Sequence, residues 1–162
     1  HPATEPYIRG GVWTAAHEGG RLIAHTLLPE KAAIEKIGGP GRQFFVDGHN
    51  FAMPNNTPPD TTALLGQWRV EVKPSRASGT TVFLHLLEAV DIGTTAPVEC
   101  RKIAKGKRSG VRIAEGKRVT EVLFDTEGAA GGHVTVRDAG RTIVDRELSR
   151  AVQPQKGLFG TE

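Results

Sequence analysis

"QWRVEVKP", residues 67–74, is the stretch that decides the fold class. Trp68, Val70 and Val72 alternate with a charged residue at each intervening position. This two-residue period is typical of a β-strand with one apolar and one polar face. Pro74 cannot donate a backbone hydrogen bond, so it ends the strand. The pattern predicts a half-buried strand.

Similar stretches recur on both sides of this strand, while almost no helical period is found. "RLIAHTLL" (21–28) and "RQFFVDG" (42–48) precede it, and "TTVFLHLLEAVD" (80–91), apolar on both faces, predicts a central strand. Five more follow at intervals near ten residues: "VECRKIAK", "GVRIAEG", "RVTEVLFD", "HVTVRDAG" and "RTIVDREL", with "DAGR" (138–141) as a hairpin turn. "AAIEKIG" (32–38) allows one helical turn at most. We predict an all-β fold, an antiparallel β-sandwich or stacked sheets of about ten short strands.

Bulk composition is consistent with this prediction. The chain has 162 residues with 20 glycines and 10 prolines, which favours many turns, and a formal charge of +3. The single cysteine, Cys100, excludes an internal disulfide, and no apolar run approaches the ~20 residues of a membrane span. "DIGTTAP" (91–97) separates an apolar half from a more basic half, so we expect two parts, 1–91 and 92–162. Because residue 1 is histidine, we expect a mature product or a piece of a longer chain.

Glycines surround the first candidate site. In "IGGPGRQFFVDGHNF" (37–51), His49 and Asn50 follow a short apolar strand, a position that suits contact with a ligand. A plain turn is the alternative, because asparagine tolerates unusual backbone angles. Arg69 is a further substrate-binding candidate, since its neighbour Trp68 could stack on a sugar ring; in an alternating strand, however, a tryptophan is more often a core residue.

The second candidate is a basic stretch, "RKIAKGKRSGVRIAEGKR" (101–118), in which Glu115 is the only acid. Clustered cations can hold an anionic polymer through many weak contacts. From this stretch we select Arg101, Lys102, Lys107 and Arg108 as candidates for binding an anionic polysaccharide. The alternative is a solvated hairpin whose lysines protect an edge strand from aggregation. We expect no nucleic acid as partner, because the stretch lacks aromatic residues for base stacking.

The quoted phrases also carry a resemblance. "GGRLIAHTLLPEKAAIEKIGGPGRQFFVDGHNF", then "GQWRVEVKPS" and "TVFLHLLEAVD" resemble, in this order, the C-terminal β-sheet region of heparinase II/III-like polysaccharide lyases. The similarity covers roughly residues 19–91. It implies a larger periplasmic or secreted enzyme, in which an α-helical toroid precedes the β-sheets and a uronic-acid-containing polysaccharide is cleaved by β-elimination.

The same resemblance limits what this chain does by itself. No stretch matches the family's catalytic motifs, and Tyr7 is the only tyrosine available as a base, so we assign no catalytic residue and no metal ligand. Any divalent metal would be held elsewhere in the full enzyme, and the N-terminal catalytic part of that enzyme, in the same chain or in a separate one, would be a partner. Two alternatives stay open: a stand-alone carbohydrate-binding β-sandwich, and a copper-dependent polysaccharide monooxygenase that uses His1, which resembles the first residue of such enzymes.

Overall fold

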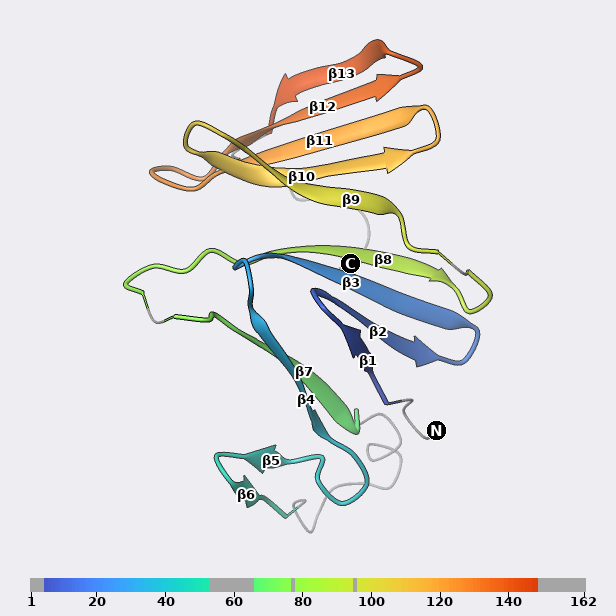
Figure 1. The fold of residues 1–162 in the computed structure, drawn as a ribbon, viewed down its shortest axis with the longest axis vertical. Helices are drawn as coiled ribbons and strands as arrows, with labels where there is room; N and C mark the ends of the chain where they lie inside the picture. Colours follow the sequence, from blue (N-terminus) through green and yellow to red (C-terminus); the bar gives the residue numbers. More distant parts are fainter. Residues whose placement is uncertain (1–4, 53–65, 77, 95, 149–162) are drawn as a thin grey trace, which may run out of the picture. The chain divides into compact units, whose positions relative to one another are not determined.

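The structure is a computed structural model, and it describes residues 5–52, 66–76, 78–94 and 96–148. Within these ranges the chain has thirteen strands and no helix, and every strand pairing is antiparallel. The prediction of an all-β, antiparallel fold is therefore confirmed (Figure 1). The chain divides into two compact units, His1–Pro97 and Val98–Glu162, which are described separately below.

Unit 1 is built around a four-stranded sheet with the order β1-β2-β3-β8. Its strands are β1 (Tyr7–Arg9), β2 (Val12–His17), β3 (Gly20–Leu28) and β8 (Leu84–Asp91). The first three form consecutive hairpins, whereas β8 returns to pair with β3 only after more than fifty residues. Two of these strands, β1 and β2, were not predicted from the sequence.

The β8 strand corrects one prediction. "TTVFLHLLEAVD" was predicted to be a central strand, but β8 is an edge strand, and its exposure alternates along Leu84–Asp91. Leu87, on the exposed face, keeps 59% of its surface accessible. A run of apolar residues therefore does not require burial on both faces in this sheet.

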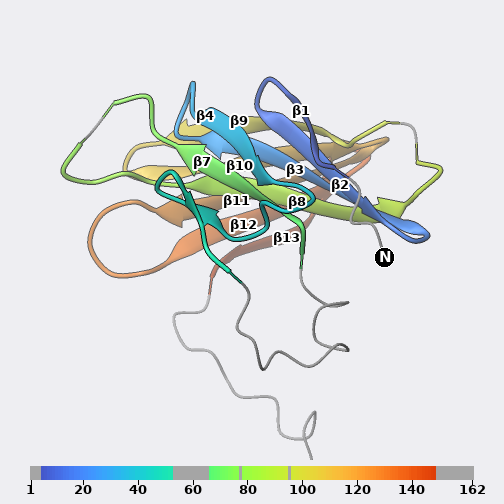
Figure 2. The same ribbon diagram turned by 90° about the horizontal axis from the view of Figure 1, so that it is seen from below.

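Two smaller antiparallel pairs complete unit 1. One consists of β4 (Ala33–Gly38) and β7 (Trp68–Lys73), which lie side by side in Figures 1 and 2; the other consists of β5 (Phe45–Val46) and β6 (His49–Asn50). The predicted helical turn at 32–38 is wrong, because these residues pair along the whole of β7 instead. The predicted strand at 42–48 shortens to two residues.

The glycines after β4 explain why the chain turns there. At Gly38 (φ 127°) a Cβ atom would lie 2.2 Å from the carbonyl oxygen of Gln67, and at Gly39 (φ 94°) it would lie 2.9 Å from the ring of Trp68. Only glycine allows this backbone conformation and this close approach together. The "GGPG" stretch is therefore a packed turn against the start of β7.

Unit 2 is one five-stranded sheet with the order β13-β12-β11-β10-β9, so each strand pairs with its neighbour in sequence (Figure 1). The strands are β9 (Glu99–Lys105), β10 (Arg108–Glu115), β11 (Arg118–Asp125), β12 (Gly132–Asp138) and β13 (Arg141–Glu147). All five were predicted. The β12–β13 turn at "DAGR" is also confirmed, with positive φ at Ala139 and Gly140.

The core of the described residues is thin. Ile23, Ala24 and Val111 are the buried aliphatic side chains there, and no large side chain is fully buried. In unit 1, His25 on β3 forms a pair with Glu88 on β8, and each side chain is 9% exposed. Pairing across two strands satisfies polar groups that would otherwise be costly to bury.

The division between the units falls a few residues after the predicted one at 91/92. Arg21 on β3 donates hydrogen bonds to the carbonyl oxygens of Ile92 (2.9 Å) and Thr94 (3.1 Å). These two bonds attach the segment after β8 to unit 1. The first unit consequently extends to Pro97.

Candidate functional site

The candidates from unit 1 lie in three different environments. His49 is exposed on β6, and its ring contacts that of Phe51 edge-on at a centroid distance of 4.6 Å. The side-chain nitrogen of Asn50 donates to the carbonyl oxygen of Gly41 at 2.8 Å, so Asn50 fastens the glycine-rich turn. Arg69 is half-buried and donates through Nε to Glu71 at 2.7 Å. None of the three pockets formed by described residues is lined by His49, Asn50 or Arg69.

The candidates from the basic stretch are also dispersed, in this case by strand alternation. Arg101 and Lys102 are consecutive on β9, so their side chains point to opposite faces of the sheet. Lys107 lies in the β9–β10 turn and forms an ion pair with Glu127 at 2.7 Å. Arg108 starts β10 and shares the face of Arg101.

Arg108 is occupied by two carboxylates. It donates through Nε to Asp125 at 2.7 Å and through both terminal nitrogens to Glu147 at 3.2 and 3.0 Å. The hydrogen bonds that Arg108 donates to Glu147 first, and to Asp125 next, raise the pKa of Arg108 above its usual value. Two carboxylates already compensate the charge of this guanidinium, so it attracts an anionic polymer only weakly. This favours the interpretation of the basic stretch as a structural, solvated surface.

A hollow of about 440 Å³ does adjoin Arg108 in unit 2. It brings together two of the predicted residues, Lys107 and Arg108, and is lined by Lys105, Lys107, Arg108, Leu123, Asp125, His133 and Glu147. Its histidine, His133, lies 3.0 Å from Asp145. Arg108 pairs with Asp125 and Glu147 inside this hollow, and Lys107 pairs with Glu127 beside it, so both of the predicted residues already have acidic partners.

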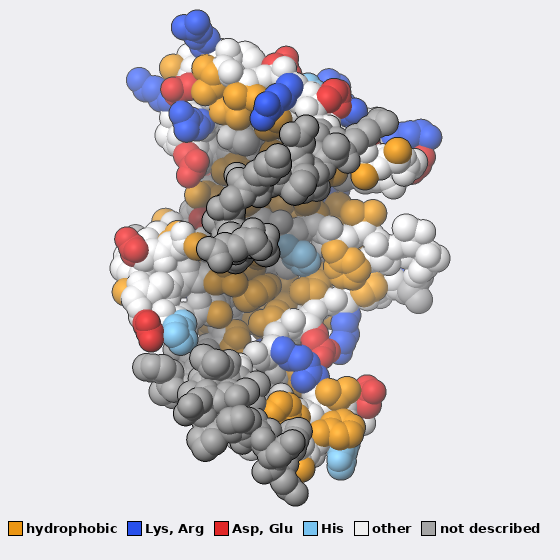
Figure 3. All heavy atoms as spheres, turned by 180° about the vertical axis from the view of Figure 1, so that it is seen from behind, with side chains coloured by type: hydrophobic (Ala, Val, Ile, Leu, Met, Phe, Trp, Pro, Cys, Tyr) orange, Lys and Arg blue, Asp and Glu red, His pale blue; other side chains and the backbone are white. Residues whose placement is uncertain are grey.

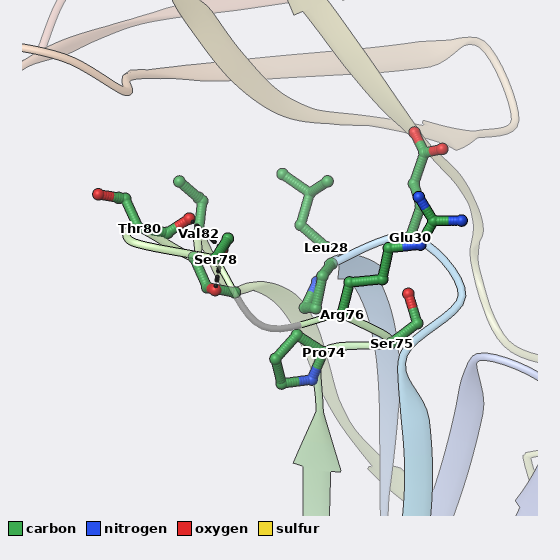
Figure 4. Close-up of a pocket in the computed structure, with 10 residues that line it drawn as sticks. Leu28, Glu30, Pro74, Ser75, Arg76, Ser78, Thr80 and Val82 are labelled. Atoms are coloured by element: carbon green, nitrogen blue, oxygen red, sulfur yellow. Dashed lines mark hydrogen bonds between the residues drawn. The ribbon is translucent and has the colours of Figure 1, made fainter.

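A different pocket, in unit 1, has the opposite character. It has a volume of about 410 Å³ and lies where the β3–β4 loop meets the segments that follow β7 and precede β8 (Figure 4). Its described lining is contributed by these three segments: Leu28, Pro29, Glu30, Pro74, Ser75, Arg76, Ser78, Thr80, Thr81 and Val82. The volume falls within the range of about 300–1,000 Å³ that is usual for ligand pockets.

The lining of this pocket combines three kinds of group. Leucine, valine and two prolines supply apolar surface, four residues supply hydroxyl groups, and Glu30 and Arg76 supply charge. Arg76 is exposed, and none of the hydrogen bonds or ion pairs among the described residues engages it. The pocket therefore presents a guanidinium that is not already neutralised by a described acid.

Metal chemistry finds no support in the described ranges. No group of three or more histidine, cysteine, aspartate or glutamate side chains there is placed to hold a metal ion. His1, the residue on which a copper site would depend, lies outside the described residues. Nor does the described part of the chain contain a helix of the length and hydrophobicity needed to cross a membrane.

Comparison with known proteins adds no relative. No family model matches the chain, and no curated protein matches it.

The pocket residues were missed by the sequence reasoning. The signal lies in "KPSRASGTT" (73–81), a polar stretch that holds one arginine among four hydroxyl residues between two strands. This composition is also typical of any loop. The pairing of β4 with β7 and the return of β8 to β3 together bring Leu28 and Glu30 opposite this stretch, and those residues are more than forty positions away.

Proposed function

We propose that this chain is the C-terminal β-sheet portion of a periplasmic or secreted polysaccharide lyase of the heparinase II/III type. In this role it supports a separate catalytic part and contacts a uronic-acid-containing polysaccharide, which the catalytic part cleaves by β-elimination. The chain itself contributes no catalytic residue.

The order of the family-like phrases supports the proposal. "RLIAHTLLP" forms β3 and the start of the loop after it, "IGGPG" the packed turn after β4, "WRVEV" most of β7, and "LHLLEAVD" β8. These phrases thus form the strands and turns that hold unit 1 together, including its long-range pairing of β3 with β8. If this chain is a supporting domain, we expect its resemblance to the family to lie in the residues that form its strands and turns.

The single observation that carries the proposal is the amount of uncovered apolar surface in unit 1. Phe83 and Leu87, at 49% and 59% exposure, share one face of the β8 region with His85, whose ring stacks near that of Phe83. Hydrophobic side chains are gathered in the middle of Figure 3, at the level of β3 and β8. A thin core beside exposed aromatic and aliphatic side chains is typical of a piece that packs against another part of its protein.

The deciding experiment is native and intact mass measurement of the protein purified from its source. We expect a second, larger chain to accompany this one, and the complex to release products that absorb as unsaturated uronates. A lone 17.4 kDa species that melts sharply and cooperatively would contradict the proposal.

A stand-alone carbohydrate-binding module is the second candidate. The pocket of unit 1 that Arg76 lines, called the Arg76 pocket below, favours this candidate, because all of the pocket's described lining belongs to unit 1. Such a module would bind polysaccharide without any partner chain. The mass measurement separates the two candidates, since only the lyase requires a second chain. A copper oxidase that uses His1 would instead bind copper tightly and lose it when the N-terminal amine is blocked.

A further inference from the structure

We infer that the Arg76 pocket is a subsite for one carboxylate-bearing sugar unit of an anionic polysaccharide, with Arg76 as the residue that binds the carboxylate. The inference rests on the proposed function, in which this chain contacts the substrate, and adds where it does so. None of the residues selected from the sequence lines this pocket.

Arg76 has the properties that carboxylate recognition requires. A guanidinium presents paired N–H donors in a planar fork that matches the two oxygens of a carboxylate. Arg69 in unit 1 and Arg108 in unit 2, by contrast, already have protein acids as partners. Arg76 has no such partner among the described residues and lines a pocket rather than a flat sheet face.

The hydroxyl groups supply the second element of sugar recognition. Ser78 donates from Oγ to the carbonyl oxygen of Thr80 at 2.7 Å and lies 3.0 Å from Oγ1 of Thr81. These contacts hold the segment before β8 in a compact turn. Ser75, on the segment after β7, lines the same pocket, so hydroxyls are contributed by both segments.

The arrangement of the side chains suits a ring with two unlike sides. In Figure 4, Arg76 and Glu30 extend on one side of the pocket, and Ser78, Thr80 and Val82 lie on the other. Leu28 projects between the two groups, and Pro74 lies beneath. A pyranose ring has apolar C–H faces and a polar rim, so it can lie against the leucine and proline surface while its carboxylate faces the arginine.

The ligand class follows from this combination of groups. Apolar surface with hydroxyls alone would suit a neutral sugar, and a lone arginine would suit any small anion. Together they select a polyhydroxylated ring that carries negative charge. Between carboxylate and sulfate, we choose the carboxylate, because it is planar and accepts two parallel hydrogen bonds from a guanidinium.

The experiment is an NMR titration of the full 162-residue chain with hexuronate tetrasaccharides. Matched probes are the same tetrasaccharides with each carboxylate reduced to a hydroxymethyl group, and a sulfated neutral tetrasaccharide. We expect the uronate to shift resonances of residues 74–82, the reduced probe to bind at least tenfold more weakly, and the sulfated probe to bind more weakly than the uronate.

Three variants localise the binding. Arg76→Ala should lower the affinity for the uronate about tenfold, and Arg76→Lys should retain part of it, because charge is kept while the planar fork is lost. Arg141→Ala removes the same charge from an exposed position on β13 and should change the affinity less than twofold. Since Arg76 is exposed, its replacement should leave the melting temperature unchanged, and Arg76→Lys keeps the test valid if the alanine variant is poorly folded.

The inference is overturned if the uronate does not bind, if Arg76→Ala binds as tightly as the native chain, or if the reduced probe binds equally well. Stronger binding of the sulfated probe would overturn the choice of carboxylate. The lyase proposal fails separately, on the absence of a second chain in the mass measurement. Uronate binding through Arg76 by a lone chain would leave the subsite standing and make the protein a binding module.

Discussion

The two units build their sheets in different ways. In unit 2 each strand pairs with the next one in the chain, and all four of its turns contain a glycine with φ between 58° and 82°. In unit 1, β8 pairs with β3 across the intervening β4–β7 segment. The meander yields a sheet in which charges such as those of Arg112 and Glu121 pair across neighbouring strands. The long-range return instead brings distant loops together, and the Arg76 pocket lies where they meet.

The distribution of ion pairs follows the same difference. On one face of unit 2, Glu121 on β11 lies near both Arg112 (3.7 Å) and Arg137 (3.4 Å) on the adjacent strands. The register places Arg112 directly opposite Glu121 and Arg137 diagonally across from it, on the same face. A loop-built pocket has no register of this kind, which is why Arg76 can remain unneutralised by a described acid.

The largest effect should come from Gly110→Ala. A Cβ atom there would lie 1.8 Å from the carbonyl oxygen of Val122 in the paired strand, and backbone cannot move aside as a side chain can. We expect the free energy of unfolding of unit 2 to fall by about 3 kcal/mol, at the upper end of overpacking effects. Both tryptophans, Trp13 and Trp68, belong to unit 1, so urea unfolding followed by fluorescence should keep its midpoint while circular dichroism reports early loss of strand.

Gly79→Ala is the matched control, because nothing lies within 4 Å of a Cβ atom at that position. Equal shifts of the fluorescence and dichroism midpoints in Gly110→Ala would show that the two units unfold as one. The two units would then not unfold independently of each other.

The next effect concerns the long-range pairing in unit 1. Glu88→Ala removes the buried partner of His25 and should lower the free energy of unfolding of this unit by about 2 kcal/mol, because a buried polar group is left unsatisfied. Tryptophan fluorescence in urea measures it directly. Glu35→Ala, at a half-exposed pair with Lys73, is the control and should have a much smaller effect. Comparable losses in the two variants would mean that the β3–β8 pair is not a main support of unit 1.

A smaller effect is expected at the end of unit 1. Arg21→Ala removes two hydrogen bonds to the carbonyl oxygens of Ile92 and Thr94, so the segment between the units should open more often. Limited proteolysis should cleave between residues 91 and 98 several-fold faster, while the sheet stability changes by about 1 kcal/mol. Arg9→Ala, which removes an exposed arginine from β1, serves as the control. An unchanged cleavage rate would place the effective boundary nearer to residue 91.

The smallest effect is a pH dependence of stability that comes from Glu71 on β7. The hydrogen bond from Arg69, followed by that from Lys73, holds the pKa of Glu71 below its usual value. The charged form therefore stabilises the fold above the unfolded pKa of about 4.3, and this contribution is lost as the pH falls through the lower folded pKa. The urea midpoint of the native chain should fall slightly more between pH 6 and pH 3 than that of Glu71→Gln. Parallel curves would show that the Glu71 pair does not contribute.

Prediction from the sequence succeeded where the signal is local. The strands of unit 2, the hairpin at Ala139 and Gly140, and the alternation of β7 follow from periodicity and turn residues. It failed where pairing overrides local preference: "AAIEKIG" became β4 because β7 provides a partner along its full length. The candidate residues were chosen by type and neighbourhood, and strand alternation then separated Arg101 from Lys102.

The sequence by itself determined that this chain is all-β, because periods of two and closely spaced turns leave no apolar stripe for a helix. The tertiary structure alone decided which cations are neutralised, as at Arg108, and which line a pocket, as at Arg76. The physical reason is that a partner's charge or a neighbouring loop comes from residues far along the chain, and only strand pairing brings them within contact distance.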